Sequence, residues 1–510
     1  MKSTCSKRFR MSCRRLLYVT TIAAAVLRLA PDIGAQWKRG ANVQSSRIGR
    51  VDAAQTAGSL IGIQYEQWFY GPESWKTSEA LPVLGKYTTD EPTVTRHYEA
   101  FRDLGIDWLL IDWSNMLWSK PAWEEHAGDT KKLEDKTAVL FETALHLHQQ
   151  GKYAPKLVIM LGLQNGPPVP NGVERLNGEL AWLKTNYLDR PQYKDLWLYD
   201  GKKPLLVVLY WPPDPCSQLS KDLAQTKLKG EDWTIRWMSS QLQNNHAENC
   251  GMWSWMDGVI PQILTKHNGR AEEIVVTPSS FQLPGGGWTD SSAIPRDHGF
   301  PYLESWSAAF ESRPKFIQIH QWNEFAGQAD GHGLQDNYWG LPNFKTPVKS
   351  SHEIFADEYN EQLSDDIEPT ELHACMLRGC GGWGYYYYNL TRALISLYRG
   401  QTPDITVLAL SGPTPNVDPE AKSISLRWRY LGKAPSSYSL SLDGHLIRHL
   451  FKATSCELRV ENLSAGQHTV KLIAAGVYTY FSLDPRHATI RSHHALPVES
   501  EITFEVKARE

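Results

Sequence analysis

The 510-residue sequence lacks most of the motifs that would assign it to a common functional class. Its seven cysteines show no CxxC spacing, which argues against a zinc site. No GxGxxG or GxxxxGK[ST] turn follows any strand-like run, and no G-x-S-x-G elbow is present. The net charge of −3 is not the basic excess of a nucleic-acid-binding protein. We therefore expect no nucleic-acid partner, no metal and no cofactor.

Apolar runs long enough to cross a bilayer are also missing, since a span needs about 20 residues. The N-terminal run LYVTTIAAAVLRLA is shorter, follows a basic segment and precedes small residues at Gly34 and Ala35. This arrangement is typical of a secretory signal peptide. We interpret residues 1–35 as a signal peptide. The expected product is a secreted or periplasmic monomer with no membrane segment after cleavage.

Five cysteines remain after the signal peptide. In an oxidising compartment Cys216–Cys250 and Cys375–Cys380 are plausible disulfides, although sequence alone does not fix the pairing. Cys456 alternates with apolar residues in a strand-like run. We interpret it as a buried free thiol.

Aromatic residues are abundant, with 20 Trp and 22 Tyr, and apolar runs alternate with helical stretches between residues 60 and 400. These runs are SLIGIQY, IDWLLIDW, KLVIMLGLQ, KPLLVVLY, DGVIPQI, EEIVVTPSS, KFIQIHQW and CGGWGYYYYN. Eight strand-then-helix units predict an α/β fold, a (β/α)8 TIM barrel, over residues 36–402. A doubly wound open sheet is the alternative.

The composition changes near residue 400, where a stretch rich in Pro, Gly and Thr indicates a domain boundary. Short alternating segments follow, including ISLRWRYL, SYSLSLDG, CELRVENL and SEITFEV. Alternation with turn residues between the segments is typical of antiparallel strands. Residues 403–510 are predicted to form a β-sandwich of immunoglobulin or fibronectin type III character.

Candidate site residues follow from the barrel, because its catalytic groups lie at the carboxyl ends of the strands. Acids, amides and aromatics recur at these ends. Paired carboxyl groups cleave glycosidic bonds and aromatic faces stack on sugar rings, so a polysaccharide or glycan is the expected partner. The candidate catalytic residues are Glu66, Asp112 and Glu324, and the candidate substrate-binding residues are Tyr65, Trp68, Trp113, Asn165, Trp211, His320, Trp322 and Asn323.

Each candidate also has a purely structural interpretation. Glu324 could cap the following turn, and Asp112 could be a helix N-cap. Glu66 could face solvent or an inner salt bridge, and His320 could be a core histidine. A loop acid, Asp330, could reach the cleft instead.

Four stretches carry a resemblance to a known family: YEQWFYG, LPVLGKYTTDEPTVTRHYEAFRDLGIDWLLIDW, HQWNEFAG and YNEQLSDDIEP. Over residues 60–400 the sequence resembles glycoside hydrolase families 99 and 71, including the WbsX-like proteins. The resemblance implies a (β/α)8 barrel that hydrolyses glycosidic bonds, with the glutamate of the seventh strand, here Glu324, in the active centre beside Asn323. Family 99 enzymes place a second glutamate three residues later, and this sequence has Gly327 there.

The second carboxyl group must therefore come from another strand, and Asp112 is the leading candidate, followed by Glu66 and Asp330. The sequence thus predicts an exported glycoside hydrolase. Glu324 is expected to act as base or nucleophile and Asp112 or Glu66 as acid. A non-catalytic glycan-binding protein and a glycan transferase or lyase are the open alternatives.

Overall fold

The computed structural model describes two regions of regular structure within the compact unit Val51–Glu510. The predicted signal peptide and the candidates Asn165, Trp211 and Asp330, with Gly327, lie outside the described residues. The described residues are 58–75, 78, 80–114, 116, 128–164, 169–210, 212, 214–239, 251–256, 260–281, 293–294, 296–325, 364–372, 374–376, 379–412, 416–479 and 496–508.

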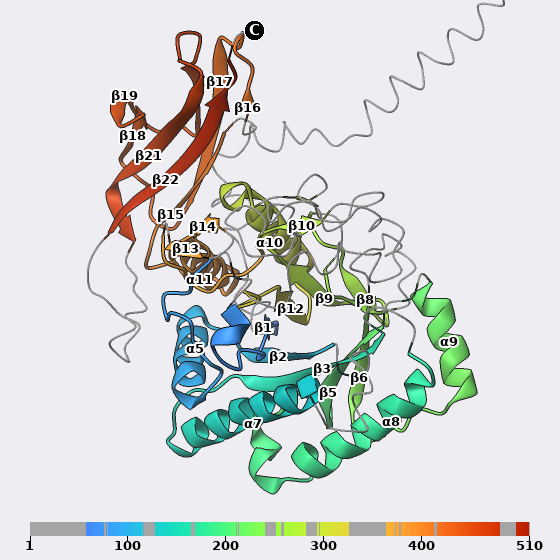
Figure 1. The fold of residues 1–510 in the computed structure, drawn as a ribbon. Coiled ribbons are helices and arrows are strands. Elements are labelled where there is room, and N and C mark those ends of the chain that lie inside the picture. The colour runs from blue at the N-terminus through green and yellow to red at the C-terminus, as the bar shows by residue number, and fades with distance from the viewer. Residues whose placement is uncertain are drawn as a thin grey trace, which may run out of the picture. The chain divides into compact units, whose positions relative to one another are not determined.

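The first region is a nearly closed barrel, which confirms the predicted fold class (Figure 1). Its parallel strands neighbour each other in the order β7-β6-β5-β3-β2-β1-β12-β9, and β8 pairs antiparallel with β9. The barrel strands are β1 (Leu60–Tyr65), β2 (Trp108–Trp113), β3 (Lys156–Gln164), β5 (Lys203–Tyr210), β6 (Thr234–Ser239), β7 (Trp253–Ser254), β9 (Arg270–Val276) and β12 (Phe316–Ile319). The shorter strands are β4 (Tyr199–Asp200), β8 (Thr265–His267), β10 (Ser280–Phe281), β11 (Ala293–Ile294), β13 (Ala374–Met376) and β14 (Gly379–Gly381).

Side chains join the two ends of this sheet, between β7 and β9. The backbone N–H of Ser254 donates to Oε2 of Glu273 at 3.1 Å, and the indole of Trp253 donates to Oε2 of Glu272 at 3.2 Å. Both glutamates belong to β9 and are buried. Between β7 and β9, side-chain carboxylates therefore accept the hydrogen bonds that the backbone of a neighbouring strand accepts elsewhere in the barrel.

Helices follow most of the strands and lie outside the sheet (Figure 1). The first of them is capped at its start by Asp90, whose carboxylate accepts the N–H of Thr93 at 3.0 Å, and at its end by Gly105, which has a φ of 85°. The helices are α5 (Glu91–Leu104), α7 (Gly128–Gln149), α8 (Gly172–Leu183), α9 (Pro215–Gln225), α10 (Phe300–Ser312) and α11 (Tyr386–Tyr398). Short helical turns are η2 (Pro72–Trp75), η3 (Lys184–Leu188), η4 (Pro191–Leu196) and η6 (Asp297–Gly299).

Two strand predictions are wrong. The run CGGWGYYYYN does not form the eighth strand, because α11 begins within its tyrosines and buries Tyr387 and Tyr388. Packing has overridden the preference of tyrosine for strands. The predicted strand over DGVIPQI is also absent at residues 260–263, the part of that run that the structure describes. Conversely, the sequence did not predict β6, because Arg236 interrupts its apolar pattern. Along the described chain β12 is consequently the last of eight parallel strands, not the seventh.

Arg236 is accommodated in β6 by two acidic partners. Its guanidinium lies 2.9 Å from carboxylate oxygens of Asp200 and Glu272. All three side chains are largely buried, so these charge-assisted hydrogen bonds satisfy a group that would otherwise disfavour a strand at this position. Charge pairing therefore explains why a strand with a central arginine forms here.

The barrel interior is filled by large apolar side chains, and two glycines make room for their strands. A Cβ on Gly62 would lie 2.0 Å from the indole of Trp108, which occupies the interior. A Cβ on Gly162 of β3 would lie 1.6 Å from the carbonyl oxygen of Ser114, just after β2. Absence of a side chain is thus required where neighbouring strands approach each other closely.

We expect Gly162→Ala to destabilise the protein by about 3 kcal/mol or more, since the obstructing atom belongs to the backbone and cannot move alone. Urea unfolding followed by circular dichroism measures this change. Gly71→Ala is the matched control, because a Cβ there meets no atom within 4 Å. Equal unfolding midpoints for the two variants would contradict the prediction.

The second region is a two-sheet β-sandwich, as predicted. In β17 the side chains of Ile424, Leu426 and Trp428 alternate inward with exposed neighbours, which gives a common core between the sheets. One sheet contains β15 (Val407–Ser411), β17 (Ser423–Leu431) and β20 (Ser455–Arg459); the other contains β16 (Asn416–Val417), β22 (Leu496–Val506), β21 (Gly466–Thr479), β18 (Ser437–Leu442) and β19 (His445–Leu450).

The cysteines follow the sequence interpretation in part. Cys216 forms a disulfide, and Cys456 is a free thiol, half-buried rather than buried, whose pKa is raised by burial. The backbones of Cys375 and Cys380 face each other in the β13–β14 hairpin. Cys250 as the partner of Cys216 and a disulfide between Cys375 and Cys380 both remain predictions.

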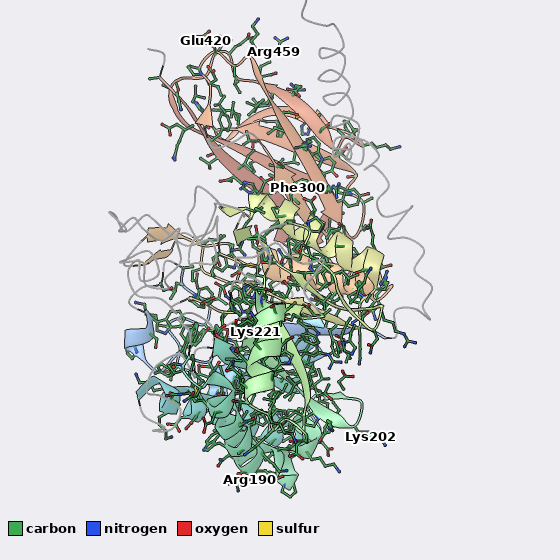
Figure 2. All side chains as sticks on the ribbon, turned by 90° about the vertical axis from the view of Figure 1, so that its right-hand side faces the viewer. Arg190, Lys202, Lys221, Phe300, Glu420 and Arg459 are labelled. Carbon is green, nitrogen blue, oxygen red and sulfur yellow. The ribbon has the colours of Figure 1, made fainter. Side chains whose placement is uncertain are left out.

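Many charged side chains lie on the outside of both regions. Figure 2 labels several of them, and Arg190, Lys202, Lys221 and Glu420 are exposed, whereas the labelled Phe300 is buried. Among the helices that the structure describes, none combines the length and the apolar character needed to cross a membrane.

Candidate functional site

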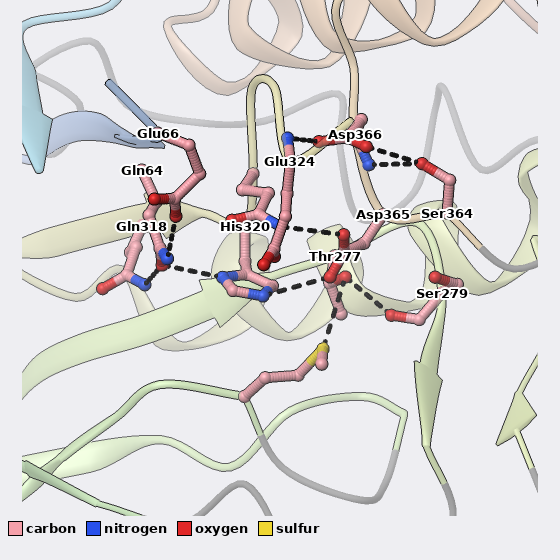
Figure 3. A network of polar contacts seen from close by, with 12 residues as sticks. Gln64, Glu66, Thr277, Ser279, Gln318, His320, Glu324, Ser364, Asp365 and Asp366 are labelled. Carbon is pink, nitrogen blue, oxygen red and sulfur yellow. Dashed lines mark hydrogen bonds and ion pairs between the residues drawn. The ribbon is translucent and has the colours of Figure 1, made fainter. Parts of the chain in front are cut away.

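Polar side chains from three neighbouring strands meet at one end of the barrel, and Figure 3 shows those near the ends of β1 and β12. β1 pairs with β2 on one side and with β12 on the other. Their carboxyl ends therefore bring Glu66, Asp112 and Glu324 into one buried polar network, and His320 also belongs to it. All four side chains are at most 6% exposed.

Glu66 and Asp112 form a carboxyl pair held by Gln64. The amide nitrogen of Gln64 donates to Oε1 of Glu66 at 3.0 Å and to Oδ2 of Asp112 at 3.1 Å. Burial raises the pKa of both carboxyl groups, and that of Glu66 rises well above its ordinary value of 4.5 with a further contribution from the charge of Asp112. Two buried carboxyl groups this close share a proton more readily than they both ionise.

The hydrogen bonds indicate which member of the pair holds that proton. Asp112 accepts the backbone N–H of Ser114 at 2.6 Å, and this bond lowers its pKa against the effect of burial. Oε2 of Glu66 accepts no hydrogen bond from a donor in the described residues, as expected of an oxygen that carries a proton. The directions of the two pKa shifts therefore favour the proton on Glu66 and the negative charge on Asp112.

Hydrogen bonds fix both the side chain and the backbone of Glu324. The amide nitrogen of Gln321 donates to Oε2 of Glu324, and the backbone N–H of Glu324 donates to Oδ1 of Asp366. The hydroxyl of Ser364 donates to the other oxygen of Asp366 at 2.9 Å. Burial and the neighbouring Asp365 raise the pKa of Asp366 to about 8.

His320 connects the two carboxyl groupings. Its Nδ1 lies 2.8 Å from Oε1 of Gln64, and its Nε2 lies 3.0 Å from Oδ2 of Asp365. The amide nitrogen of Gln321 lies 3.4 Å from the other oxygen of Asp365. A continuous chain of polar contacts thus runs from Glu66 through Gln64, His320 and Asp365 to Gln321 and Glu324. Figure 3 labels all of these residues except Gln321.

Asn323 fixes the backbone of Glu66. Its side-chain oxygen accepts the N–H of Glu66 at 2.9 Å, and its amide nitrogen donates to the carbonyl of Glu66 at 3.0 Å. The amide also contacts the hydroxyl of Tyr87 at 3.2 Å, which donates to Glu368 at 2.7 Å. His97 contacts the same carboxylate at 3.1 Å. Asn323 therefore positions a site residue through both of its amide atoms.

The segment 364–368 was not assigned a role from sequence, although it supplies three buried acids. It runs beside the residues after β12: the N–H of Gln321 donates to the carbonyl of Asp365 at 3.1 Å, and the N–H of Ile367 donates to the carbonyl of Gln321 at 3.0 Å. The sequence feature that could have identified this segment is the acid-rich SDDIEP, which lies in one of the four stretches that carry the family resemblance. For Gln64 the signal was its spacing of two from Glu66, which places both on one face of β1.

Three of the aromatic candidates pack against helices, Tyr65 and Trp113 from the other face of their strands and Trp322 from the segment after β12. The hydroxyl of Tyr65 lies 2.9 Å from Nδ1 of His97 on α5, and the indole of Trp113 donates to Thr137 on α7 at 2.7 Å. Trp322 packs edge to face on Phe101 of α5 with a centroid distance of 4.8 Å. These rings are fully buried against helices and do not line the polar network. Trp68, also a candidate, is half-buried.

A buried cation balances part of the acidic charge. The guanidinium of Arg296 donates to the backbone carbonyl of Asp366 at 2.6 Å and is 1% exposed. Its central carbon lies 3.6 Å from the ring centroid of Tyr387 and 4.3 Å from that of Trp383. Stacking on aromatic faces stabilises a guanidinium that has left water. Within the described residues, no group of three metal-ligating side chains has the geometry to hold a metal ion.

Another buried carboxyl group, Glu179 on α8, lies outside this network. It is 0% exposed and both its oxygens lack a hydrogen-bond partner in the described structure. Burial and the nearby Glu134 raise its pKa well above 4.5. The folded state therefore holds this proton more tightly than the unfolded state. The contribution of Glu179 to the free energy of unfolding is greatest below pH 4.5 and falls as the pH rises toward the folded-state pKa of Glu179.

Glu179→Gln is therefore expected to raise the free energy of unfolding at pH 7 by about 1–2 kcal/mol and to have little effect at pH 4. Chemical denaturation at the two pH values measures this difference. The control is Glu174→Gln, an exposed position on the same helix. A gain in stability that is equal at both pH values would rule out the proposed cause.

The fold and the network define the kind of protein: a (β/α)8 barrel with a buried carboxyl cluster at the carboxyl ends of its strands, followed by a β-sandwich. No protein-family model and no curated protein matches the sequence.

Among solved structures, the chain is similar to two of the GH99 endo-alpha-mannosidase from Bacteroides thetaiotaomicron, one of them in complex with BIS-TRIS-propane. The identity is 14% over 69% of this chain and 99% of that chain, with TM-scores of 0.42 and 0.43. A beta-glucuronidase from Bacteroides uniformis is 10% identical over 88% of this chain and 46% of its own, with a TM-score of 0.33. At this identity and overlap, function has to be inferred from the side chains of the barrel itself.

Proposed function

We propose that the protein is a glycoside hydrolase that cleaves a polysaccharide or complex glycan. The observation that supports this most directly is the buried pair of Glu66 and Asp112 at the ends of β1 and β2, in which the pKa of Glu66 is raised, with Glu324 following the neighbouring strand β12. Hydrolysis of a glycosidic bond needs one carboxyl group that donates a proton and one carboxylate that activates water or attacks the sugar.

We assign the acid to Glu66 rather than Asp112. Glu66 keeps its proton to a higher pH because it is buried beside an ionised carboxylate, whereas Asp112 accepts hydrogen bonds that favour its charged form. When Glu66 gives its proton to the glycosidic oxygen, two negative charges remain side by side in a buried place. Their repulsion favours reprotonation of Glu66, which prepares the next cycle.

Glu324 has the complementary role of base or nucleophile. Gln321 directs its amide at one carboxylate oxygen of Glu324, and Asp366 accepts the backbone N–H of the same residue. These bonds restrict the rotation of the side chain. Asn323 and Gln64 fix Glu66 in the same way, so both carboxyl groups are held in place before substrate arrives.

Export to an oxidising compartment is part of this proposal. It is supported by the signal-peptide pattern of residues 1–35 and by the disulfide of Cys216, since disulfides persist mainly outside the cytosol. An exported enzyme would meet extracellular or periplasmic glycans. The N-terminal residue of the mature protein, determined after expression with its own signal, tests this part.

The test of the activity is a screen of bacterial, plant and fungal polysaccharides in water enriched in ¹⁸O. A hydrolase produces new reducing ends that carry one ¹⁸O atom. A lyase produces unsaturated ends without the label, and a transferase produces no net increase in reducing ends. Retention of glycans in affinity electrophoresis without any cleavage would instead support the glycan-binding alternative.

A further inference from the structure

The segment 364–368 supplies a buried acid, Glu368, whose hydrogen bonds lead to Glu66. The side chain of Glu368 is 0% exposed. One of its carboxylate oxygens, Oε2, accepts the hydroxyl of Tyr87 at 2.7 Å. The other, Oε1, is hydrogen-bonded to Nε2 of His97 at 3.1 Å. Both oxygens of this buried carboxyl group therefore have a hydrogen-bond partner.

The backbone of Glu66 fixes the orientation of the Asn323 amide. A backbone N–H only donates, so the Asn323 atom that lies 2.9 Å from the N–H of Glu66 is the side-chain oxygen. The amide nitrogen then donates its two hydrogens to the carbonyl of Glu66 at 3.0 Å and to the hydroxyl oxygen of Tyr87 at 3.2 Å. Tyr87 thus accepts from Asn323 and has its own hydrogen left for another partner.

That partner is Glu368, because a carboxylate oxygen accepts hydrogen bonds. Burial and the negative charge of Glu368 raise the pKa of Tyr87 well above 10, so the hydroxyl keeps the hydrogen that it donates. The ring of Tyr87 packs edge to face on Trp75 and Phe69, with centroid distances of 4.9 Å and 5.0 Å. The hydrogen bonds therefore run in one direction, from Asn323 through Tyr87 to Glu368.

His97 and Tyr65 form a second arm that ends at the same acid. The hydroxyl of Tyr65 lies 2.9 Å from Nδ1 of His97, and within the described residues this is the hydrogen bond found for that hydroxyl. Donation from Tyr65 to Nδ1 leaves an N–H on Nε2 that donates to Glu368. In this arrangement every hydroxyl and ring nitrogen of the two arms has a partner. Glu368 is the acceptor in which both arms end.

We propose that Glu368 is a positioning residue, which acts through Tyr87 and Asn323 on the acid of the reaction. By accepting the hydroxyl of Tyr87 it holds the Asn323 amide in the orientation that fixes the backbone of Glu66. A buried hydroxyl that loses its acceptor becomes unsatisfied, which disfavours this orientation. The effect on catalysis rests on the proposed function, whereas the effect on the backbone of Glu66 is a property of the fold alone.

The segment 364–368 thereby holds both of the proposed catalytic groups. Asp366 accepts the backbone N–H of Glu324, and Glu368 acts on Glu66 through the hydrogen bonds that lead to it. The separation of two catalytic carboxyl groups determines whether a glycosidase retains or inverts the configuration of the sugar. A single stretch of chain that positions both groups contributes to setting this separation.

Hydrogen exchange of the Glu66 backbone N–H tests the positioning without any substrate. Tyr87→Phe removes the hydroxyl and keeps the ring, and we expect this N–H to exchange about 3–10-fold faster, as the loss of one hydrogen bond allows. Mass spectrometry with electron-transfer fragmentation resolves the single amide. Tyr98→Phe is the control, because the buried hydroxyl of Tyr98 donates to the carbonyl of Leu140 at 3.1 Å and lies outside this group. It should leave the exchange at Glu66 unchanged.

Two substitutions of Glu368 test the acceptor from the other end. Glu368→Leu removes both oxygens and is expected to speed the exchange as Tyr87→Phe does, so either variant serves if the other does not fold. Glu368→Gln keeps one oxygen for the hydroxyl of Tyr87, and the exchange at Glu66 should stay within about twofold of wild type. Unchanged exchange in a folded Tyr87→Phe or Glu368→Leu protein would overturn the proposal. Fast exchange in Glu368→Gln would overturn the role of Glu368 as the acceptor.

Rates on a cleaved glycan test the link to catalysis. In Tyr87→Phe, kcat on a natural glycan should fall about tenfold with little change in KM, and the loss should be much smaller on aryl glycosides with good leaving groups. Combined with Glu66→Gln, the same substitution should cause almost no further loss, since the acid that it positions is gone. Equal losses on both kinds of substrate, or losses that multiply in the double variant, would overturn the positioning role. If no glycan is cleaved, the proposed function fails, while the exchange rates still decide whether Glu368 positions the backbone of Glu66.

Discussion

Replacement of Glu324 by glutamine is expected to lower the rate of glycan cleavage by roughly 10²–10⁴-fold, the loss typical when a catalytic carboxylate is removed. Glutamine keeps the size of the side chain, and its oxygen can still accept the hydrogen bond of Gln321. The fold should therefore survive while the base or nucleophile is lost. Initial rates of reducing-end formation measure the effect, with thermal unfolding as the check on the fold.

The rate loss in Glu324→Gln should be similar for substrates with good and poor leaving groups, because a nucleophile attacks the sugar carbon and a base activates the attacking water, and neither acts on the departing oxygen. Glu505→Gln, an exposed position in β22, is the matched control and should keep full activity. Full activity of a correctly folded Glu324→Gln enzyme would remove Glu324 from the mechanism.

Glu66→Gln is expected to have two effects of opposite sign, a loss of activity and a gain in stability at neutral pH. A glutamine here accepts the hydrogen bond of Gln64 and donates to Asp112, as protonated Glu66 does, but it has no proton to give to a leaving group. Activity should fall by roughly 10²–10⁴-fold on natural glycans and much less on aryl glycosides with good leaving groups. That dependence on the leaving group distinguishes an acid from a base.

The gain in stability follows from the raised pKa of Glu66. In the unfolded chain the carboxyl group ionises near its ordinary value of 4.5, but in the folded chain burial and the charge of Asp112 hold the proton to higher pH. The unfolded state therefore loses its proton first as the pH rises, and folding becomes less favourable above pH 4.5. Glutamine removes this effect, which we expect to be worth about 1–2 kcal/mol at pH 7 and close to zero at pH 4.

Denaturant unfolding at both pH values measures the stability of Glu66→Gln against wild type. The exposed Glu174→Gln is again the control. A variant that is less stable than wild type at pH 7 would show that Glu66 is ionised in the folded protein. In that case Asp112, the acid favoured by the sequence, becomes the better candidate for proton donor.

Much of the candidate site could be predicted from sequence because strand ends are local features. An apolar run followed by a polar residue indicates the point where a barrel strand reaches the mouth, and this reasoning nominated Glu66, Asp112 and Glu324. The same local pattern predicted the barrel and the sandwich. It failed where packing overrides local preference, as in α11, whose tyrosines favour strands in isolation but are buried along a helix.

Local patterns were also insufficient for the aromatic candidates. Tyr65 and Trp113 follow or end their strands as sugar-stacking residues would, yet each lies one residue from an acid of the network and so on the opposite face of its strand. Because side chains alternate between the two faces of a strand, the sequence shows which residues share a face with the acids once the inward face is known. Which face turns inward depends on the neighbouring strands.

The sequence by itself therefore determined the two folds, the order of their strands at most positions and the three acids at the strand ends. Only the tertiary structure indicated which of those acids has the higher pKa, and it revealed Gln64, Asp365 and Asp366 as their partners. The physical reason is that a pKa depends on burial and on charges a few ångströms away, and these are supplied by distant parts of the chain. The contact between Gln64 and His320, for example, joins residues 256 positions apart.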